Sequence, residues 1–264
     1  MKRLASLLLI SLGASSAWAA NLSINFPVSE DGRHQFFQEL LVESLKAAGH
    51  NVSLNGVDIP RHKRSYLFLE SGKIDLLWML PSAERDARFT RINQPLTRGL
   101  IGTRILLIPP GEESRFASIN SLEDFKRTGM VGGFGGGWVD IAIWKANGLP
   151  TYEHNGEWND LFRLVASKMR GIDYFPRGAN EIGREAAMHS NLIIEPRLML
   201  TYPADFHYYI ARNRRDLIDA LNTALPQAMK NGVYDRLYKQ HLEPIARSLN
   251  LSERRNIKLE LPAS

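Results

Sequence analysis

A glycine-rich stretch in the middle of the chain restricts the fold more than any other part of the sequence. A short apolar run ends at Val131, and five glycines then fall within the six residues 132–137. An apolar pattern compatible with a helix resumes after Trp138. Glycines in this position favour a tight turn from a strand into a helix. The stretch therefore predicts a β-strand, a turn and an α-helix in direct succession, which is typical of α/β folds.

A turn of this kind can also bind a ligand. The N–H groups at a helix start carry partial positive charge, and glycine lets a ligand approach the main chain because it has no Cβ. The stretch does not match the nucleotide-binding turns, since it lacks Gly-Lys-Ser/Thr and has Trp138 at the last glycine position of Gly-x-Gly-x-x-Gly. We expect Gly135, Gly136 and Trp138 to contact a small ligand. The alternative is a flexible surface loop.

The first nineteen residues have the pattern of an export signal. Lys2 and Arg3 precede an apolar core at 4–12, and residues 17–19, Ala-Trp-Ala, form a small-x-small cleavage site. The core is shorter than the roughly 20 apolar residues that a membrane-spanning helix needs. The chain has no Cys, which argues against a lipid anchor, disulfides and thiolate metal sites. We therefore expect residues 1–19 to be a signal peptide and the protein to reach the periplasm without a lipid anchor.

Length and charge narrow the function classes. Cleavage after residue 19 of 264 leaves 245 residues, enough for two lobes of ~100 to 150 residues each. The formal charge of +5 falls to +3 once Lys2 and Arg3 are removed, which is too small to indicate nucleic-acid binding. The seven His are scattered and form no His-x-x-x-His pair. We expect neither a metal site nor a cofactor.

Strand and helix patterns alternate along the chain, and one junction occurs twice. Apolar strand patterns at 22–26, 51–54 and 74–79 are separated by helical patterns, which predicts a mainly parallel sheet with ligands at its carboxyl end. Residues 71–78, at a helix-to-strand junction, are similar to residues 169–176, and both contain Ile-Asp shortly after a glycine. Such a repeat suggests two similar lobes. We expect the last twenty residues to form a short helix and an extended surface tail.

Several segments resemble the extracellular solute-binding proteins of amino-acid ABC transporters. Residues 84–95 are similar to the Glu-Arg … Phe-Ser-x-Pro stretch of that family, and they follow its helix and Gly-x-x-Asp strand. Further similar segments occur in the family's order at 121–125, 217–222 and 231–238. The resemblance covers nearly the whole mature chain.

The resemblance implies an α/β fold of the two-lobed type II periplasmic-binding-protein class. In that fold each lobe is a mainly parallel sheet flanked by helices, and ligand is enclosed between the lobes by hinge closure. We expect two hinge crossings, near 95–102 and 201–206. Lobe one would then comprise residues 20–97 plus 206–264, and lobe two residues 98–205. The glycine-rich turn would face the cleft from lobe two.

The resemblance also nominates ligand-binding residues. Arg85 matches the family's arginine that pairs with the ligand α-carboxylate, and a planar guanidinium can grip a carboxylate through two parallel hydrogen bonds. The alternative is an ordinary salt bridge with Glu84 or Asp86. Ser82, three residues before Arg85, could donate a hydroxyl hydrogen bond.

Two tryptophans are further candidates for ligand contact, and one arginine departs from the family's pattern. Trp78 and Trp138, one from each lobe, could sandwich a ligand, with core packing as the competing role for Trp78. The family has an acidic residue for the ligand's ammonium group where this chain has Arg177 and its neighbours. Asp140 or Glu181 is the alternative to that acid. Arg177 itself would suit a second negative group on the ligand, or it is a solvated loop arginine.

These observations predict a periplasmic protein, not an enzyme, that binds a small polar or anionic solute such as an amino acid or related organic acid. Its expected partners are that solute and an inner-membrane ABC permease or a sensor receptor, and we expect a monomer. One alternative is a dehydratase-like enzyme on the same scaffold, with Glu181 or Glu185 as general acid or base. The other is a ligand sensor for a membrane receptor.

Overall fold

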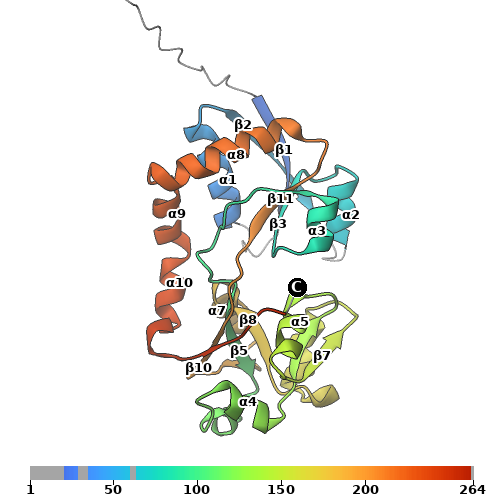
Figure 1. The fold of residues 1–264 in the computed structure, drawn as a ribbon, viewed down its shortest axis with the longest axis vertical. Coiled ribbons are helices and arrows are strands. Elements are labelled where there is room, and N and C mark those ends of the chain that lie inside the picture. The colour runs from blue at the N-terminus through green and yellow to red at the C-terminus, as the bar shows by residue number, and fades with distance from the viewer. Residues whose placement is uncertain (1–20, 29–34, 60–63, 263–264) are drawn as a thin grey trace, which may run out of the picture.

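The computed structural model describes residues 21–28, 35–59 and 64–262, which form two lobes stacked along the long axis of the molecule (Figure 1). Lobe one contains β1 (Asn21–Val28), α1 (Gln35–Ala47), β2 (Asn51–Asp58), α2 (Ser65–Glu70), β3 (Leu76–Met79), α3 (Ala83–Arg88), β4 (Thr90–Arg91), β11 (His207–Ile210), α8 (Arg215–Lys230) and α9 (Val233–His241). Each lobe combines sheet and helices, so the predicted two-lobed α/β fold is confirmed.

Lobe two follows the same plan. It contains β5 (Thr103–Ile108), η2 (Glu113–Phe116), α4 (Leu122–Thr128), β6 (Gly132–Gly135), α5 (Val139–Ala146), β7 (Thr151–His154), α6 (Asp160–Ala166), η3 (Met169–Gly171), β8 (Phe175–Gly178), α7 (Ala179–Met188), β9 (Ile193–Ile194) and β10 (Leu198–Thr201). The C-terminal segment adds α10 (Glu243–Ser248), η4 (Leu251–Glu253) and β12 (Arg255–Lys258).

Parallel and antiparallel strands combine in the same way in the two lobes. In lobe one, β1 and β2 are parallel, and β11 lies antiparallel between β3 and β4. In lobe two, β6 and β7 are parallel, and β5 is antiparallel to both β8 and β10. A parallel bridge between Gly132 and Tyr174 joins β6 to the start of β8. The carboxyl ends of β6 and β8 therefore lie at one edge of lobe two.

Helix α1 shows why these patterns form a core. Its buried side chains recur at three- and four-residue spacing, so one face of the helix is apolar and packs on the sheet. The members of that face are Phe36, Phe37, Leu40, Leu41, Ser44 and Leu45. Helices α8 and α9 pack against α1 and complete this part of lobe one.

An aspartate joins two neighbouring strands in each lobe by the same pair of hydrogen bonds. The N–H of Asp75 donates to Asn25 O at 2.9 Å, and its carboxylate accepts from Asn25 N at 2.6 Å. The N–H of Asp173 donates to Val131 O at 2.9 Å, and its carboxylate accepts from Val131 N at 2.8 Å. Each carboxylate also pairs with an arginine, Arg214 and Arg115 respectively. The repeat in the sequence is therefore a repeat in the structure.

The two predicted crossings between the lobes lie against each other. The Asp205 carboxylate, in the second crossing, accepts hydrogen bonds from Thr97 N at 2.8 Å, Thr97 Oγ1 at 2.6 Å and Gly99 N at 2.7 Å. A Cβ on Gly102 would lie 2.5 Å from Tyr202 O, so only glycine allows this close approach. These two crossings thus form one compact junction.

The C-terminal segment differs from its predicted place. β12 pairs in parallel with β10, from Leu198 opposite Arg255 to Thr201 opposite Lys258. The alternating residues Ile257 and Leu259 are 3% and 4% exposed and belong to the core of lobe two. These two side chains gain burial by joining the open edge of β10. The predicted assignment of 206–264 wholly to lobe one is therefore wrong for β12, and α10 with η4 adds a third connection between the lobes (Figure 1).

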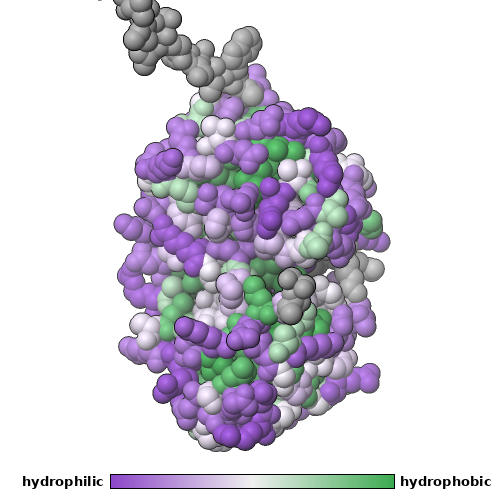
Figure 2. Space-filling model, in the orientation of Figure 1, coloured by the Kyte–Doolittle hydropathy of each residue, from purple (hydrophilic) through white to green (hydrophobic). Residues whose placement is uncertain are grey.

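The predicted signal peptide lies outside the described residues. Within the ranges given above, no helix is both long and apolar enough to cross a membrane. The face of the molecule in Figure 2 is largely hydrophilic, with hydrophobic residues in separate small patches.

Replacing Asp205 by Ala removes the acceptor that fastens the two crossings. Because Thr97 N and Gly99 N lose their partner, we expect the free energy of unfolding to fall by about 2 kcal/mol. Urea denaturation at neutral pH measures this change. Asp219→Ala, at an exposed position of α8, is the control and should change stability by less than about 0.5 kcal/mol. Equal stability of the two variants would show that the carboxylate does not hold the junction.

Candidate functional site

One edge of lobe two is formed by the carboxyl ends of β6 and β8 and by the first turns of α5 and α7 (Figure 1). The first N–H of α7, from Ala179, donates to Leu100 O in the first crossing at 3.1 Å. Gly178 lies against Ile101, since a Cβ on Gly178 would be 2.6 Å from Ile101 Cδ1. This edge therefore adjoins the junction of the lobes, where the sequence predicts the ligand site.

Arg85 lies in the first turn of α3 and is held in place by its neighbours. Ser82 is the N-cap of this helix, and its Oγ accepts from Arg85 N at 3.3 Å. The guanidinium donates to Leu80 O at 2.5 Å and lies 5.7 Å from the centre of the Tyr66 ring. The Ser82 hydroxyl proton is still available for a ligand, because the cap uses the oxygen only as an acceptor.

The salt bridges that would give Arg85 a purely structural role do not form. Glu84 pairs with Arg88 at 2.7 Å, and Asp86 pairs with Arg91 at 3.3 Å. Among the described residues, no carboxylate oxygen lies within 4.0 Å of the Arg85 guanidinium. The guanidinium thus keeps its charge and part of its donor set available.

Trp78 and Trp138 each stack on rings of their own lobe. The Trp78 ring centre lies 4.6 Å from that of Phe37 with a 10° interplanar angle, and it packs at the border of the core. The Trp138 ring lies 6.1 Å from that of Phe175 at 23°. Core packing, the competing role for Trp78, is therefore present in the structure. Both rings remain partly exposed, and their contact with a ligand stays a prediction.

The glycine-rich turn offers fewer free donors than the sequence suggests. Gly136 N donates to His154 O at 2.8 Å, and Gly137 N donates to the Glu153 carboxylate at 3.0 Å. The N–H of Trp138 also has an acceptor within the turn. The expectation of an open row of N–H groups is therefore wrong at these positions, because strand β7 accepts from Gly136 and Gly137, and Gly135 O accepts from Trp138.

Gly135 has a packing role that the sequence does not reveal. A Cβ on Gly135 would lie 2.6 Å from Trp138 Nε1, so the indole ring lies directly over this glycine. The missing side chain makes room for the aromatic ring at the start of α5.

Arg177 is neither a solvated loop residue nor free to bind an anion. It is 5% exposed, and Nε and Nη2 donate to the two oxygens of Glu185 at 2.6 Å each. Glu181 lies 3.1 Å from Nη2. Burial alone would lower the pKa of the guanidinium, but Glu181 and Glu185 raise it above its usual value. The loop interpretation is wrong because the end of β8 turns this side chain inward onto α7.

A second buried arginine continues the same network. Arg104 on β5 pairs with Asp140 at 2.8 Å, and both side chains are almost fully buried. Arg104 Nε donates to Tyr202 Oη at 2.8 Å, and that hydroxyl donates to Asp140. Asp140 is therefore not available to a ligand's ammonium group. The sequence contains one signal for this pair, since an arginine inside the apolar strand Thr103–Ile108 has to find a charged partner.

Glu181 links the two arginines and is the carboxylate in this network with access to solvent. Its oxygen lies 3.1 Å from Arg177 and 3.9 Å from Arg104, and its side chain is 28% exposed. Burial raises the pKa of Glu181 above its usual value, Arg177 opposes that shift, and Glu185 adds to it. We name the group Arg104, Asp140, Arg177, Glu181 and Glu185 the buried charge network.

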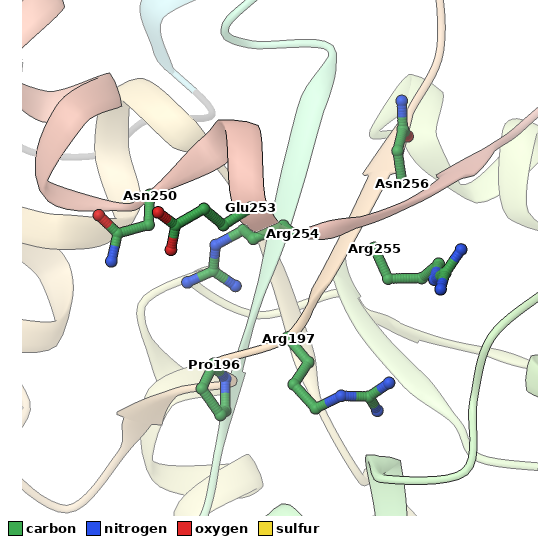
Figure 3. A pocket seen from close by; sticks show the side chains of 7 residues that line it. All are labelled: Pro196, Arg197, Asn250, Glu253, Arg254, Arg255 and Asn256. Atoms are coloured by element: carbon green, nitrogen blue, oxygen red, sulfur yellow. The ribbon is translucent and has the colours of Figure 1, made fainter.

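A surface pocket of about 360 Å³ lies away from these residues, between the start of β10 and the η4–β12 segment (Figure 3). The Arg254 guanidinium points away from those of Arg197 and Arg255. Arg254 and Arg197 donate to main-chain carbonyls, among them Leu249 O and Ala117 O. Because the three cations do not converge, we assign this pocket no role in ligand binding.

Gly135→Ala should disturb the Trp138 ring. The added methyl group overlaps the indole, so we expect a loss of about 1 to 3 kcal/mol of stability and a changed near-UV circular dichroism spectrum. Gly183→Ala is the matched control, because a Cβ there meets no atom within 4 Å. In the interior of α7, alanine should stabilise the helix by about 1 kcal/mol relative to glycine. Two variants of equal stability would contradict the packing role of Gly135.

Glu181→Gln should stabilise the protein at neutral pH. A carboxyl with a raised pKa in the folded state favours folding when protonated, and this contribution is lost as pH rises through the folded pKa. Glutamine keeps the neutral form, so the melting temperature should exceed that of the wild type at pH 7. The difference should shrink as pH falls through the raised folded pKa and should be gone at about pH 4, where the carboxyl also protonates in the unfolded chain. Glu113→Gln, on the surface, should show no such pattern, and a lower melting temperature for Glu181→Gln at pH 7 would refute the assignment.

Comparison with known proteins shows the fold. No family model matches the chain, and neither does any curated protein. An ancestral arginine-binding protein bound to arginine matches with a TM-score of 0.58 and 17% identity, over 83% of this chain and 98% of that one. A transporter binding component from Wolinella succinogenes complexed with lysine matches with a TM-score of 0.56 and 18% identity, over 79% and 85%.

A third solved structure also matches the chain. It is an ancestral amino-acid-binding protein described as a precursor of cyclohexadienyl dehydratase, with a TM-score of 0.57 and 16% identity over 84% of this chain and 96% of that one. These likenesses extend over most of both chains in each case. The chain therefore has the two-lobed fold of the amino-acid-binding and substrate-binding proteins of amino-acid ABC transporters.

Proposed function

We propose that this protein is a periplasmic solute-binding protein that captures an amino acid or related organic acid between its lobes. The observation that carries the proposal is the Arg85 guanidinium, which is positioned by Leu80 O and has no carboxylate within 4.0 Å among the described residues. A guanidinium in this state suits the carboxylate of a ligand, which it can bind through two parallel hydrogen bonds. The Ser82 hydroxyl adds a donor beside it.

Lobe two supplies the complementary charge. Glu181 is partly exposed, whereas Asp140 is almost fully buried and already paired. We assign the ligand's amino group to Glu181, with Trp138 beside it and Gly135 and Gly136 shaping the turn. The structural neighbours that carry arginine, lysine or glutamine support an amino acid as ligand class.

The compartment and the partner follow from the same proposal. The signal-like residues 1–19 support export to the periplasm, and the fold supports delivery of the solute to an inner-membrane ABC permease. A sensor for a membrane receptor would use the same binding step with another docking partner. Capture and release by a single chain suit a monomer.

A dehydratase-like enzyme is the second candidate, because one structural neighbour is described as a precursor of such an enzyme. Of the two candidate acids, Glu185 has both oxygens bonded to Arg177 and is poorly placed to transfer a proton. Glu181 has a raised pKa, which suits a general acid. Incubation with prephenate-like acids distinguishes the two functions. Binding without product supports our proposal, and product formation that is lost in Glu181→Gln supports the enzyme.

Arg85→Ala should abolish most of the affinity for a carboxylate ligand. Loss of a desolvated charge pair costs about 2 to 5 kcal/mol of binding free energy. The dissociation constant should therefore rise at least about thirtyfold. Isothermal titration with a panel of amino acids and organic acids measures it. Arg88→Ala is the matched control one turn later on α3, since Arg88 is paired with Glu70 and Glu84 and should leave binding unchanged. Equal effects of the two variants would remove Arg85 from the site.

A further inference from the structure

The Arg177 guanidinium sits in a cage of aromatic rings and carboxylates. Its central carbon lies 5.0 Å from the ring centre of Trp138, 4.8 Å from that of Trp158 and 5.1 Å from that of Phe175. Glu185 receives two of its hydrogen bonds, and the Glu181 carboxylate lies 3.1 Å away. Aromatic faces with carboxylates around one cation are the chemistry that binds guanidinium and ammonium ligands.

This cage belongs to the edge of lobe two that adjoins the first crossing between the lobes. Trp138 stands at the start of α5, Arg177 ends β8 with Gly178, and Glu181 lies in the first turn of α7. All three elements meet beside the first crossing between the lobes, where Leu100 O accepts the first N–H of α7. A side chain of a ligand entering from the cleft would reach this edge.

The net charge of the buried charge network can neutralise one ligand cation only. Arg104 and Arg177 carry two positive charges, and Asp140, Glu185 and ionised Glu181 carry three negative charges. The remaining negative charge is at Glu181, the exposed member. One ammonium group can pair with it. A second ligand cation would meet Arg177, whose like charge and desolvation both disfavour it.

We propose that Arg177 is an internal occupant of the lobe-two cation cage and thereby excludes ligands with a cationic side chain. The proposal rests on the proposed function, since it assumes that amino acids enter the cleft. It assigns this chain amino acids whose side chains are neutral or acidic, in contrast to the neighbours that carry arginine or lysine.

Matched ligand pairs test the specificity of the wild-type protein. L-arginine and L-citrulline differ in the charge of the terminal group, as do L-lysine and L-norleucine. Isothermal titration should give dissociation constants for the cationic members that are at least about tenfold weaker than for their neutral partners. Arginine binding as tight as citrulline binding would overturn the inference.

Emptying the cage tests the mechanism. In Arg177→Ala the cavity between Trp138 and Trp158 should bind methylguanidinium, which should raise the melting temperature of this variant and leave that of the wild type unchanged. Sodium chloride at equal concentration is the ionic control. The same variant should bind L-arginine better than L-citrulline, reversing the wild-type order. The double variant Arg177→Ala, Glu185→Gln lacks the carboxylate that bonds Arg177 through both oxygens and should lose most of the methylguanidinium response.

The outcomes separate this inference from the proposed function. If the wild type and Arg177→Ala bind no amino acid, the proposed function fails, and the methylguanidinium response alone decides whether the cage exists. If Arg177→Ala binds methylguanidinium but gains nothing for L-arginine, the cage is closed to the cleft and the inference fails. The wild-type comparison of arginine with citrulline does not depend on the folding of any variant.

Discussion

The pairing of buried arginines with carboxylates is the constraint on which the edge of lobe two beside the first crossing depends. Arg104 comes from β5, Asp140 from α5, Arg177 from β8 and Glu185 from α7, so one network joins four elements. An unpaired charge in such a place is costly, and each member is therefore held where its partner needs it. The network also fixes the position of the glycine-rich turn, because the Trp138 ring packs on the Arg177 guanidinium. The same ring lies over residue 135, which therefore has to be a glycine.

The ligand residues that we propose in the two lobes differ in charge. In lobe one, Arg85 is held by main-chain and aromatic contacts, and no carboxylate of the described residues pairs with it. In lobe two, Arg177 is fully compensated, and the excess charge of its network is the negative charge of Glu181. A ligand with a carboxylate at one end and an ammonium group at the other complements both sides. We propose that this complementarity, rather than the backbone donors of the turn, binds the ligand.

Local patterns in the sequence predict part of this arrangement. The repeated Ile-Asp junction predicts two similar lobes. In the structure, Asp75 and Asp173 each accept a hydrogen bond from a main-chain N–H of an earlier segment of the same lobe. The sequence does not predict the pairing of Arg177 with Glu185, since it depends on the direction in which α7 leaves β8. Nor does it predict the place of β12, which depends on the open edge of β10, 57 residues earlier, and not on its own short pattern.

A crystal structure of the protein with its bound ligand tests the central claim most directly. The account predicts a ligand carboxylate on the Arg85 guanidinium and a ligand amino group at Glu181. It also predicts that Arg177 remains bonded to both oxygens of Glu185 between the two tryptophan rings. A ligand anion on Arg177, with Glu185 displaced, would contradict the account.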